Sequence, residues 1–550
     1  MAGRKLIVIV DGDAQGQHVA EWQRQALATL AEDDMLTLLV CINTSRTSRP
    51  ARYPAYYALN LLSVRNEMTR SVPLTGIKAD IVRRVAFECE YDGAWQKLPA
   101  EIIELVAASG ACAIIKLGMG LMRIPPELQL PVLSWHHGDP EHYRGRPAGF
   151  WELLHGREVI GQMVQVLTNR LDAGQVVAFA QTRVYRHSWK QTLVDSFRHS
   201  PLLLEPALAR AIAGETLDKP TGGKNYRLPG NRAVLRVGLA LLLRKAARIA
   251  YGAFWEKNWR VSHAQLKADA DRIAIAAGHN PLPGEQGWTT PAVPRGCAFV
   301  ADPFFDADGR TLLVEALSST SGVGEIHRIA GTSAARLSDE GGHFSYPGVV
   351  SHEGRAYCVP EIAQWSEPAA YSLEPGWKRE RPLDIAGNPH ITDPTFLEHG
   401  GGLYLFGNRR EEGSNVLRLW HARNLFDRFE EHPCSPIRIS PRGGRMGGDI
   451  VRDGSRLVRL GQDFTRDYGD GLIAFEVDKL GPDSYREREI GTLRFSDRRG
   501  PHTVNFSSDG SRIVFDWYKD RFSPMAGVRR AIARLRQRQV RQRQGKPVSQ

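Results

Sequence analysis

The first third of the chain alternates short apolar runs with amphipathic stretches. The apolar runs predict buried strands over residues 6–10, 35–42, 112–117 and 131–135. The amphipathic stretches predict helices over residues 18–31 and 98–108. This alternation is typical of an α/β domain with a Rossmann-type parallel sheet that is covered by helices on both faces. Because such sheets bind ligands beyond the carboxyl ends of their strands, the residues that follow 131–135 form the first candidate site.

From residue 295 onward the pattern changes to five imperfect copies of one unit. Each copy has a polar residue, a short apolar run, a polar turn that contains glycine, and a second apolar run. The turn glycines are Gly309, Gly354, Gly401, Gly454 and Gly510. A unit of about 50 residues with paired strands is typical of one propeller blade. We therefore expect an all-β five-bladed propeller in this half of the chain.

These patterns divide the chain into four predicted parts. They are an α/β domain over residues 1–215, a basic amphipathic helical linker over 216–290, the propeller over 291–522 and a basic tail over 523–550. A chain of 550 residues is long enough for two or three domains, each of which buries its own core.

The net charge of +11 is concentrated in two segments. Residues 224–260 carry nine Lys or Arg and one Glu, and residues 521–550 carry nine and no acidic residue. The remaining chain is therefore acidic overall. This distribution argues against a protein that binds nucleic acid over its whole surface, and we expect no specific nucleic-acid partner.

The first basic segment predicts an amphipathic helix over residues 231–250. Its arginines recur at multiples of four residues and therefore share one face: Arg232, Arg236, Arg244 and Arg248. Two interpretations stay open, a helix that lies on an anionic membrane surface and a linker helix that packs on a neighbouring domain. The tail repeats the pattern, so residues 231–260 and 524–550 are both candidate membrane contacts.

The cysteine pattern and the N-terminus indicate a compartment. Six cysteines are scattered without a Cys-x-x-Cys pair, so we expect neither a disulfide framework nor a metal site. The first apolar run is too short for a signal peptide, and no apolar stretch reaches the roughly 18 residues of a spanning helix. A reducing compartment fits these features. We expect a cytoplasmic protein, with peripheral attachment to the inner membrane face left open.

The stretch after the strand at 131–135 carries the motifs with the most chemistry. It reads Ser134-Trp-His136-His137, then Tyr-Arg144-Gly, and further on Leu-Asp172-Ala-Gly. In order and spacing it resembles the active-site signature of the formyltransferase superfamily that uses 10-formyltetrahydrofolate. In that family a strand ends in Asn-x-His, followed by Tyr-Arg-Gly and then by Leu-Asp-Thr/Ala-Gly. The resemblance covers about residues 1–190.

This resemblance implies catalytic roles for His136 and Asp172. The histidine would polarise the formyl oxygen, and the carboxylate would hold the histidine in the correct charge state. Ser134 stands where the family has Asn, and loss of such an oxyanion donor costs roughly 10²–10³ in rate elsewhere. Either another group supplies the donor or the domain no longer performs the reaction. Arg144 and His137 are candidate substrate-binding residues, with support of the loop and a structural role as the alternatives.

Equivalent polar residues of the five copies predict a second site. Asp302, Asp393 and Asp449 fall at related positions, and Glu361 ends a strand. Converging carboxylates are used in glycoside chemistry, where one is kept protonated and another ionised. We take these four as substrate-binding candidates, with hairpin caps and hydrogen bonds between blades as the alternative.

The same region resembles the N-terminal, propeller-like domain of the glucosamine inositolphosphorylceramide transferases of plants. The motifs that carry this resemblance are Ala301-Asp-Pro-Phe, Tyr346-Pro, Pro360-Glu, Asp393-Pro-Thr and Gly500-Pro-His-Thr-Val. The glycosyltransferase domain of those plant proteins is not evident in this chain. The resemblance therefore implies a sugar-related module and not the plant reaction.

Together, the two resemblances imply a carbohydrate-modifying transferase. It would move a formyl group from 10-formyltetrahydrofolate to an amino sugar of a glycan or glycolipid precursor, while the propeller binds or processes the sugar. Two alternatives remain, a glycan-binding propeller joined to a catalytically weakened N-terminal domain, and a propeller that itself acts as a glycosidase or transglycosidase.

Overall fold

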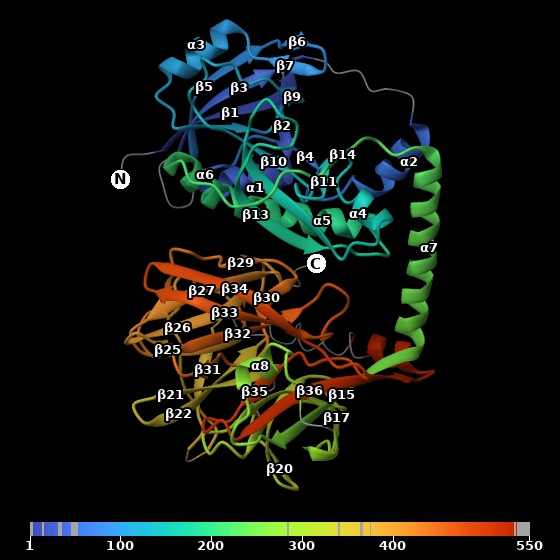
Figure 1. The fold of residues 1–550 in the computed structure, drawn as a ribbon, viewed down its shortest axis with the longest axis vertical. Coiled ribbons are helices and arrows are strands. Elements are labelled where there is room, and N and C mark those ends of the chain that lie inside the picture. The colour runs from blue at the N-terminus through green and yellow to red at the C-terminus, as the bar shows by residue number, and fades with distance from the viewer. Residues whose placement is uncertain are drawn as a thin grey trace. The chain divides into compact units, whose positions relative to one another are not determined.

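The computed structural model describes residues 4–13, 16–30, 36–45, 53–282, 285–338, 342–363, 367–374, 376–532 and 535. The chain forms two compact units, unit 1 (Met1–Ala247) and unit 2 (Arg248–Gln550), drawn as ribbons in Figure 1. Among the described residues, no helix combines the length and the apolar character needed to cross a membrane.

Unit 1 is built on a nine-stranded sheet in which five neighbouring strands are parallel. The main path runs through β5 (Ala79–Phe87), β3 (Leu36–Asn43), β1 (Arg4–Asp13), β8 (Ala113–Lys116), β10 (Val132–His136), β12 (Val159–Val166) and β13 (Gln175–Arg183). The last two strands are added antiparallel. The predicted parallel sheet is therefore confirmed.

Both faces of this sheet are buried. Neighbouring residues of a strand point to opposite faces, and residues 6–9 of β1 are all fully buried. On one face, Ile7 and Ile9 share a core with Ile102 and Val106 of α3 (Ala100–Ala108). Other helices of unit 1 are α1 (Glu21–Leu30), α2 (Pro54–Ser63), α4 (Phe150–Leu154), α5 (Trp189–His199), the 3-10 helix η1 (Ser200–Leu203) and α6 (Leu204–Ala213). Because both faces are apolar, polar chemistry is left to the strand ends.

The predicted helix over 18–31 is wrong at its start. Residues 18–20 belong to strand β2 (Gly16–Ala20), which pairs antiparallel with β4 (Ser71–Pro73), and α1 begins at Glu21. The pairing partner lies about 50 residues away, so a local pattern could not reveal it.

The predicted separate linker over 216–290 is also wrong. Strand β14 (Lys224–Tyr226) pairs with β11 (Tyr143–Gly145) and so belongs to unit 1. Helix α7 (Asn231–Phe254) follows, and β15 (Trp255–Gln265) is already a strand of unit 2, together with the short helix α8 (Arg272–Ala276). The prediction failed because basic charge and amphipathicity mark a surface and not a domain boundary.

The described part of unit 2 contains five antiparallel sheets of four or five strands (Figure 1). The first two are β17 (Cys297–Phe305), β18 (Leu312–Ser318), β19 (Gly324–Ala330), β20 (Ser333–Arg336), then β21 (Phe344–His352), β22 (Arg355–Ile362), β23 (Ala369–Ser372), β24 (Lys378–Pro382). The next two are β25 (Ile391–His399), β26 (Gly402–Arg409), β27 (Val416–Ala422), β28 (Glu430–Glu431), β29 (Arg438–Ile439), then β30 (Arg442–Met446), β31 (Val451–Asp453), β32 (Arg456–Asp463), β33 (Leu472–Gly481), β34 (Ser484–Leu493).

The fifth sheet combines strands from the beginning of unit 2 with strands from its end. Its order is β16 (Trp288–Thr289), β15, β36 (Arg512–Phe522) and β35 (Val504–Phe506). Strands β15 and β36 pair along their whole length. The hairpin glycines of the repeat all have positive φ, between 57° and 79°: Gly309, Gly354, Gly401, Gly454 and Gly510. The predicted hairpin turns are therefore confirmed.

Three of the sheets share an uncommon backbone feature in their first strand. Asp302, Tyr346 and Asp393 have φ values of 46°, 47° and 50°, and each precedes a proline at a shift of register. Residues other than glycine rarely adopt positive φ, and bulges of this kind re-aim side chains next to functional sites. The copies of the repeat therefore place different side chains at one equivalent position.

Candidate functional sites

The predicted catalytic pair of unit 1 meets at the carboxyl end of β10. His136 Nδ1 lies 3.5 Å from Asp172 Oδ1, and His136 is buried. Asp172 sits in a turn with φ of 43°, and its Oδ2 accepts a hydrogen bond of 2.8 Å from the backbone N–H of Gly145. The turn and the Tyr-Arg-Gly segment thus hold the carboxylate against the imidazole, as the spacing of the motifs requires.

The other nitrogen of His136 fixes the ring. Nε2 lies 3.0 Å from the carbonyl oxygen of Tyr143. A carbonyl oxygen only accepts, so Nε2 carries the hydrogen and Nδ1 faces the carboxylate. Gly138 makes this approach possible, because a Cβ at that position would lie 2.7 Å from Nε2. The ring is oriented by two partners on opposite sides.

Arg144 and His137 have partners within the protein. Arg144 donates from Nε to the carbonyl of Gly223 at 2.6 Å and from Nη1 to the carbonyl of Leu171 at 3.3 Å, which ties the two loops together. His137 Nε2 lies 2.8 Å from Ser200 Oγ, and its ring packs on Phe197 at 4.5 Å. Burial lowers the pKa of His137 to about 3, so the ring is neutral. A contact of either residue with substrate stays a prediction.

Ser134 is buried two residues before His136 and therefore points to the same face of β10. Its register partner on β8 is Lys116, whose Nζ donates to the carbonyl of Met119 at 3.2 Å. Burial lowers the pKa of Lys116, and the carboxylates of Asp11 and Asp172 oppose that shift. The charge of Lys116 thus lies within electrostatic reach of the predicted catalytic carboxylate.

Sequence reasoning missed the polar residues that complete this edge. Asp11 lies two residues before the end of β1 and accepts a hydrogen bond of 2.7 Å from Nδ2 of Asn43, the last residue of β3. It also accepts from the backbone N–H of Met119 at 2.8 Å. The signal was present, since each of Asp11, Asn43 and Lys116 directly follows a run of apolar residues. The carboxyl edge of the sheet therefore carries a wider polar cluster than the motif alone indicated.

A buried carboxylate lies near this site. Glu152 on α4 is 2% exposed. Burial raises the pKa of Glu152 to about 8, and the nearby carboxylate of Asp139 adds to the shift. The side chain is therefore protonated at neutral pH. Sequence reasoning gave it no role, because a single Glu in a helix is usually solvated.

The candidate site of unit 2 has a buried histidine at its centre. His502 Nε2 lies 3.1 Å from Asp302 Oδ1, and His502 Nδ1 lies 2.5 Å from Asp516 Oδ2. Burial opposes the charge, but Asp516 and Asp302 outweigh it and raise the pKa of His502 to about 10. Thr503 Oγ1 also donates to Asp302 at 2.8 Å. The histidine is therefore a cation between two buried carboxylates.

A second buried cation holds Asp393 and Glu361. Arg445 donates to both oxygens of Asp393, at 2.9 Å from Nη2, and its Nη2 lies 3.5 Å from Glu361 Oε2. Gln462 Nε2 donates to Asp393 Oδ2 at 2.9 Å. The two clusters lie within electrostatic reach of each other, since Asp302 raises the pKa of Glu361. Three of the four predicted carboxylates of unit 2 therefore converge.

The carboxyl groups of this centre differ in protonation. Burial raises the pKa of Glu361 to about 8 against the pull of Arg445, and burial with Asp302 raises that of Glu315 well above its ordinary value. Burial also opposes ionisation of Asp302, but His502 outweighs it and holds the pKa of Asp302 below its ordinary value. Protonated and ionised carboxyl groups thus share one centre, as acid–base chemistry requires.

Asp449 stands somewhat apart from this centre. Its backbone N–H donates to Asn505 Oδ1 at 2.7 Å, and its carboxylate adds to the rise in the pKa of Tyr346 that burial and Asp393 cause. Burial raises the pKa of Asp449 to about 7. Sequence reasoning missed Asp516, Arg445 and His502 as site residues, although His502 lies within a motif that carried the resemblance.

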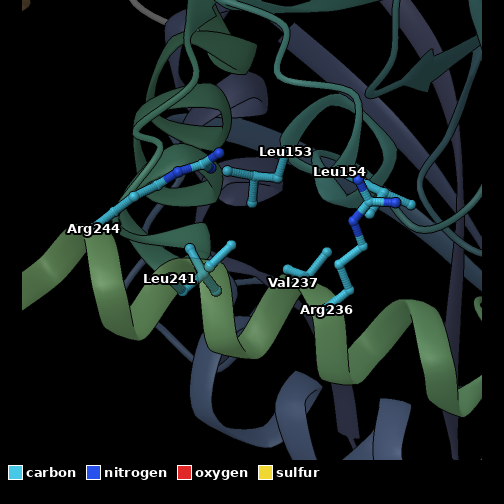
Figure 2. Close-up of a pocket in the computed structure, with 7 residues that line it drawn as sticks. Leu153, Leu154, Arg236, Val237, Leu241 and Arg244 are labelled. Atoms are coloured by element: carbon cyan, nitrogen blue, oxygen red, sulfur yellow. The ribbon is translucent and has the colours of Figure 1, made fainter.

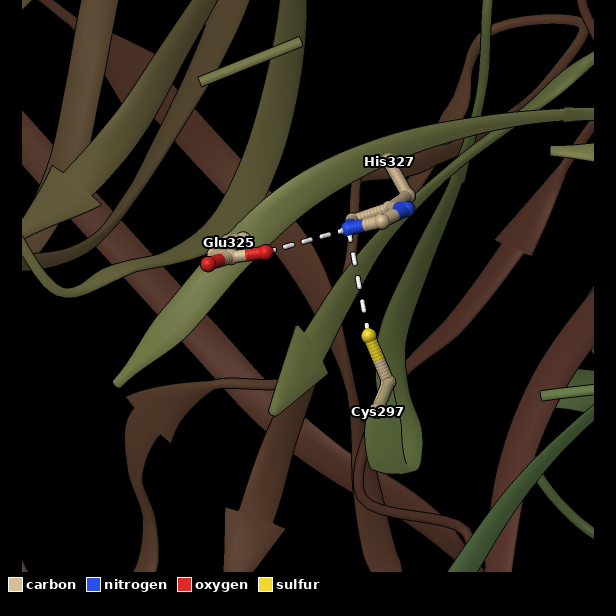
Figure 3. A group of neighbouring side chains, drawn as sticks. All are labelled: Cys297, Glu325 and His327. Atoms are coloured by element: carbon tan, nitrogen blue, oxygen red, sulfur yellow. Dashed lines mark hydrogen bonds and ion pairs between the residues drawn. The ribbon is translucent and has the colours of Figure 1, made fainter. Parts of the chain in front are cut away.

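In the described part of unit 2, two groups of side chains bring together the kinds of atoms that ligate metals, and one of them is the His502 centre itself. In the group of Asp302, His502 and Asp516 the two carboxylates raise the pKa of His502 to about 10, so a metal ion would have to displace the imidazole proton. Figure 3 shows Cys297, Glu325 and His327, with His327 Nε2 3.4 Å from Glu325 Oε2 and 4.0 Å from Cys297 Sγ. Glu325 is also paired with Arg336 at 3.5 Å. The carboxylate of this group is therefore already neutralised by the protein.

Comparison with known proteins bears on unit 2 first. Residues 287–510 match the family described as glucosamine inositolphosphorylceramide transferase 1, N-terminal. A relative of that name from Arabidopsis thaliana is 29% identical over 226 residues, which is 38% of this chain and 29% of the relative. The match thus spans less than a third of the relative's length. The resemblance indicated by the motifs of this region is confirmed.

The solved structures that are similar to the chain include a sugar N-formyltransferase and an α-L-arabinofuranosidase. A sugar N-formyltransferase from a Shewanella species is 10% identical, with a TM-score of 0.26, and the match covers 42% of this chain and 87% of that one. An α-L-arabinofuranosidase from Lactobacillus brevis is 13% identical, with a TM-score of 0.28, and the match covers 38% of this chain and 80% of that one. Scores of this size do not by themselves establish a shared fold or activity.

Proposed function

We propose that the protein is a carbohydrate-modifying transferase that couples a formyltransferase-like unit 1 to a five-bladed propeller in unit 2. Five observations of unit 2 support the propeller. There are five described sheets, and their first strands contact one another in order from β17 through β21 and β25 to β30. Strand β35 then bonds to both ends of this series, through Asn505 to Pro303 and through Val504 to Gly447. The remaining two observations are the five copies of the sequence repeat and the sheet in which β15, from the beginning of unit 2, pairs with β36, from its end.

The reaction that we propose for unit 1 is transfer of a formyl group to an amino sugar. The observation that carries it is the pairing of His136 and Asp172 at the carboxyl edge of a parallel sheet. 10-Formyltetrahydrofolate, when bound, supplies the formyl group. His136 and Asp172 fit that donor, and Ser134 offers a hydroxyl in place of the family's amide. His136 would polarise the reacting carbonyl through an Nδ1–H, since Nε2 is already bonded to the carbonyl of Tyr143, and Asp172, 3.5 Å from Nδ1, would orient the ring and stabilise positive charge on it.

Titration calorimetry with a stable tetrahydrofolate analogue tests this proposal. The full chain should bind the analogue, and Asp172→Asn should weaken binding at least tenfold, because the carboxylate orients His136. Asp218→Asn, at an exposed position of the same unit, is the matched control and should bind like the unaltered chain. Absence of binding at about 1 mM analogue, or equal binding by Asp172→Asn, would refute folate-dependent transfer.

Ser134→Asn provides a second test with a gain as its readout. If the missing amide limits the reaction, this substitution should raise formyl transfer to amino sugars by about 10²-fold, the cost of one oxyanion donor. An unchanged rate would mean that another group already supplies the donor.

The second candidate function is acid–base chemistry at a glycosidic bond in unit 2. It is favoured by one observation: one buried centre holds Glu361, whose pKa is raised to about 8, together with Asp302, whose pKa is held below its ordinary value by His502. Glu361→Gln mimics the protonated acid in shape but cannot give up a proton. If unit 2 is catalytic, the Glu361→Gln variant should still bind sugar but should no longer turn it over. If the variant keeps both binding and turnover, unit 2 is a binding module.

A further inference from the structure

Helix α7 packs on unit 1 with only one of its faces. Val234 and Val237 are buried in a core that also contains Phe150 and Trp189. Figure 2 shows Val237 and Leu241 facing Leu153 and Leu154 of α4 across a small cavity of about 90 Å³. The packing of this inner side explains why a basic amphipathic segment forms a fixed helix of 24 residues.

A second apolar face of α7 is left exposed. Leu235, Leu239, Leu242 and Leu243, the leucine face, are 74%, 56%, 68% and 63% exposed. At about 100° per residue, these four side chains fall within an arc of roughly 100° that excludes Val234 and Val237. Arg236 lies just beyond one edge of the arc and Lys245 beyond the other, while Arg232 falls within the arc, one turn before Leu235. The helix contains no acidic residue.

Unit 2 carries an apolar surface of its own beside the end of α7. The aromatic patch consists of Phe254, Trp255, Phe522, Met525 and Val528, which are 45%, 38%, 58%, 53% and 47% exposed. The Trp255 and Phe522 rings meet edge-on, with centroids 5.4 Å apart. Arg529 and Arg521 border the patch, and both pair with Glu256, at 2.7 Å and 3.3 Å.

We propose that the leucine face and the aromatic patch each bind the headgroup and acyl boundary of an anionic phospholipid bilayer. Exposed leucines bordered by Lys and Arg, without acidic residues, fit the arrangement in which apolar side chains enter the boundary and cations meet lipid phosphates. Aromatic rings favour the same depth, and the two arginines beside the aromatic patch exceed in charge the single carboxylate of Glu256 with which they pair. A protein surface that buries this many exposed large apolar side chains would have to be acidic at its rim.

A second copy of the chain is a poorer occupant of these surfaces. In a symmetric dimer, each leucine face would bring Arg232, Arg236 and Lys245 towards the same cations of its partner. Like charges at an interface disfavour association. Charge complementarity therefore favours the lipid. This inference does not depend on the chemistry proposed for either unit.

Flotation of the full chain with vesicles tests the proposal. Vesicles of phosphatidylcholine with about 30% phosphatidylglycerol should carry the protein at low salt, and pure phosphatidylcholine should carry at least tenfold less, as expected for an electrostatic contribution. Leu239→Glu with Leu242→Glu, and separately Phe522→Glu with Met525→Glu, should each reduce binding about tenfold. The matched control is Leu61→Glu with Leu62→Glu on α2, where both leucines are exposed (53% and 77%) outside the two surfaces.

Three results would overturn the proposal. The first is equal flotation with neutral and anionic vesicles, and the second is an equal loss in the Leu61/Leu62 control. The third is a dimer in light scattering that the Leu239/Leu242 variant dissociates while vesicle binding is unchanged, because the leucine face would then be a contact between copies. Far-UV circular dichroism of each variant should match the unaltered chain, since all substituted side chains are largely exposed.

Discussion

The buried carboxyl of Glu152 makes a prediction that needs no knowledge of the substrate. Glu152→Gln replaces a protonated carboxyl by a neutral amide of nearly the same shape. The side chain is 2% exposed, and its pKa of about 8, against an ordinary 4.5, means that the folded protein holds it neutral at pH 7. We therefore expect the variant to fold, and to differ from the unaltered protein in how its stability depends on pH.

The size of the effect follows from the two pKa values. The folded state binds more protons than the unfolded state between pH 4.5 and about 8. Stability contributed by this group therefore falls as pH rises through that window and is lowest above it. The difference between the folded and unfolded pKa values of Glu152 corresponds to about 5 kcal/mol of unfolding free energy over the whole window. About 2–3 kcal/mol of this contribution is lost between about pH 6 and pH 9. Glutamine does not titrate and loses none of it.

Urea denaturation of both chains at several pH values, followed by far-UV circular dichroism, is the assay. The free energy of unfolding of Glu152→Gln minus that of the unaltered chain should grow by about 2–3 kcal/mol from pH 6 to pH 9, because titration of all other groups cancels in the difference. Glu127→Gln, at an exposed turn position, is the control and should show no such growth. A flat difference for Glu152→Gln would show that the carboxyl is not buried as described, and the reasoning would fail.

Three further predictions concern stability. His502→Phe leaves Asp302 without its buried cation and should lower the free energy of unfolding by about 3–5 kcal/mol below pH 6.5. This loss should shrink as the pH rises through the pKa of about 10, because the unaltered histidine then loses its charge too. Urea denaturation at about pH 6 and pH 10 measures the difference. Arg445→Met should cost about 3–5 kcal/mol in the same assay because Asp393 is 1% exposed, and adding Asp393→Asn should recover part of the loss. Gly145→Ala should cost more than about 2 kcal/mol of unfolding free energy, since φ is 86° and a Cβ would clash with a backbone carbonyl, whereas Gly156→Ala, at φ of 70° in open space, should cost only about 1 kcal/mol.

Much of the fold could be predicted because it depends on local patterns. Runs of apolar residues placed β1, β3, β8 and β10, and the repeat with its turn glycines anticipated the hairpins of unit 2. The motif around His136 and Asp172 brought two residues into contact across a loop, because the order of the segments constrains where the chain can return. These features are written into the sequence at short range, or at a fixed period.

The tertiary structure alone decided the rest. The pairing of β15 with β36 joins residues more than 240 positions apart, so charge and amphipathicity misplaced the boundary of unit 2. The cations that neutralise the carboxylates, His502 and Arg445, come from segments far from Asp302 and Asp393. Protonation of Glu361 and Glu152 depends on burial, which is a property of the packed chain and not of any window of sequence. The sequence determined which residues could take part in chemistry, and packing determined their partners and their charge.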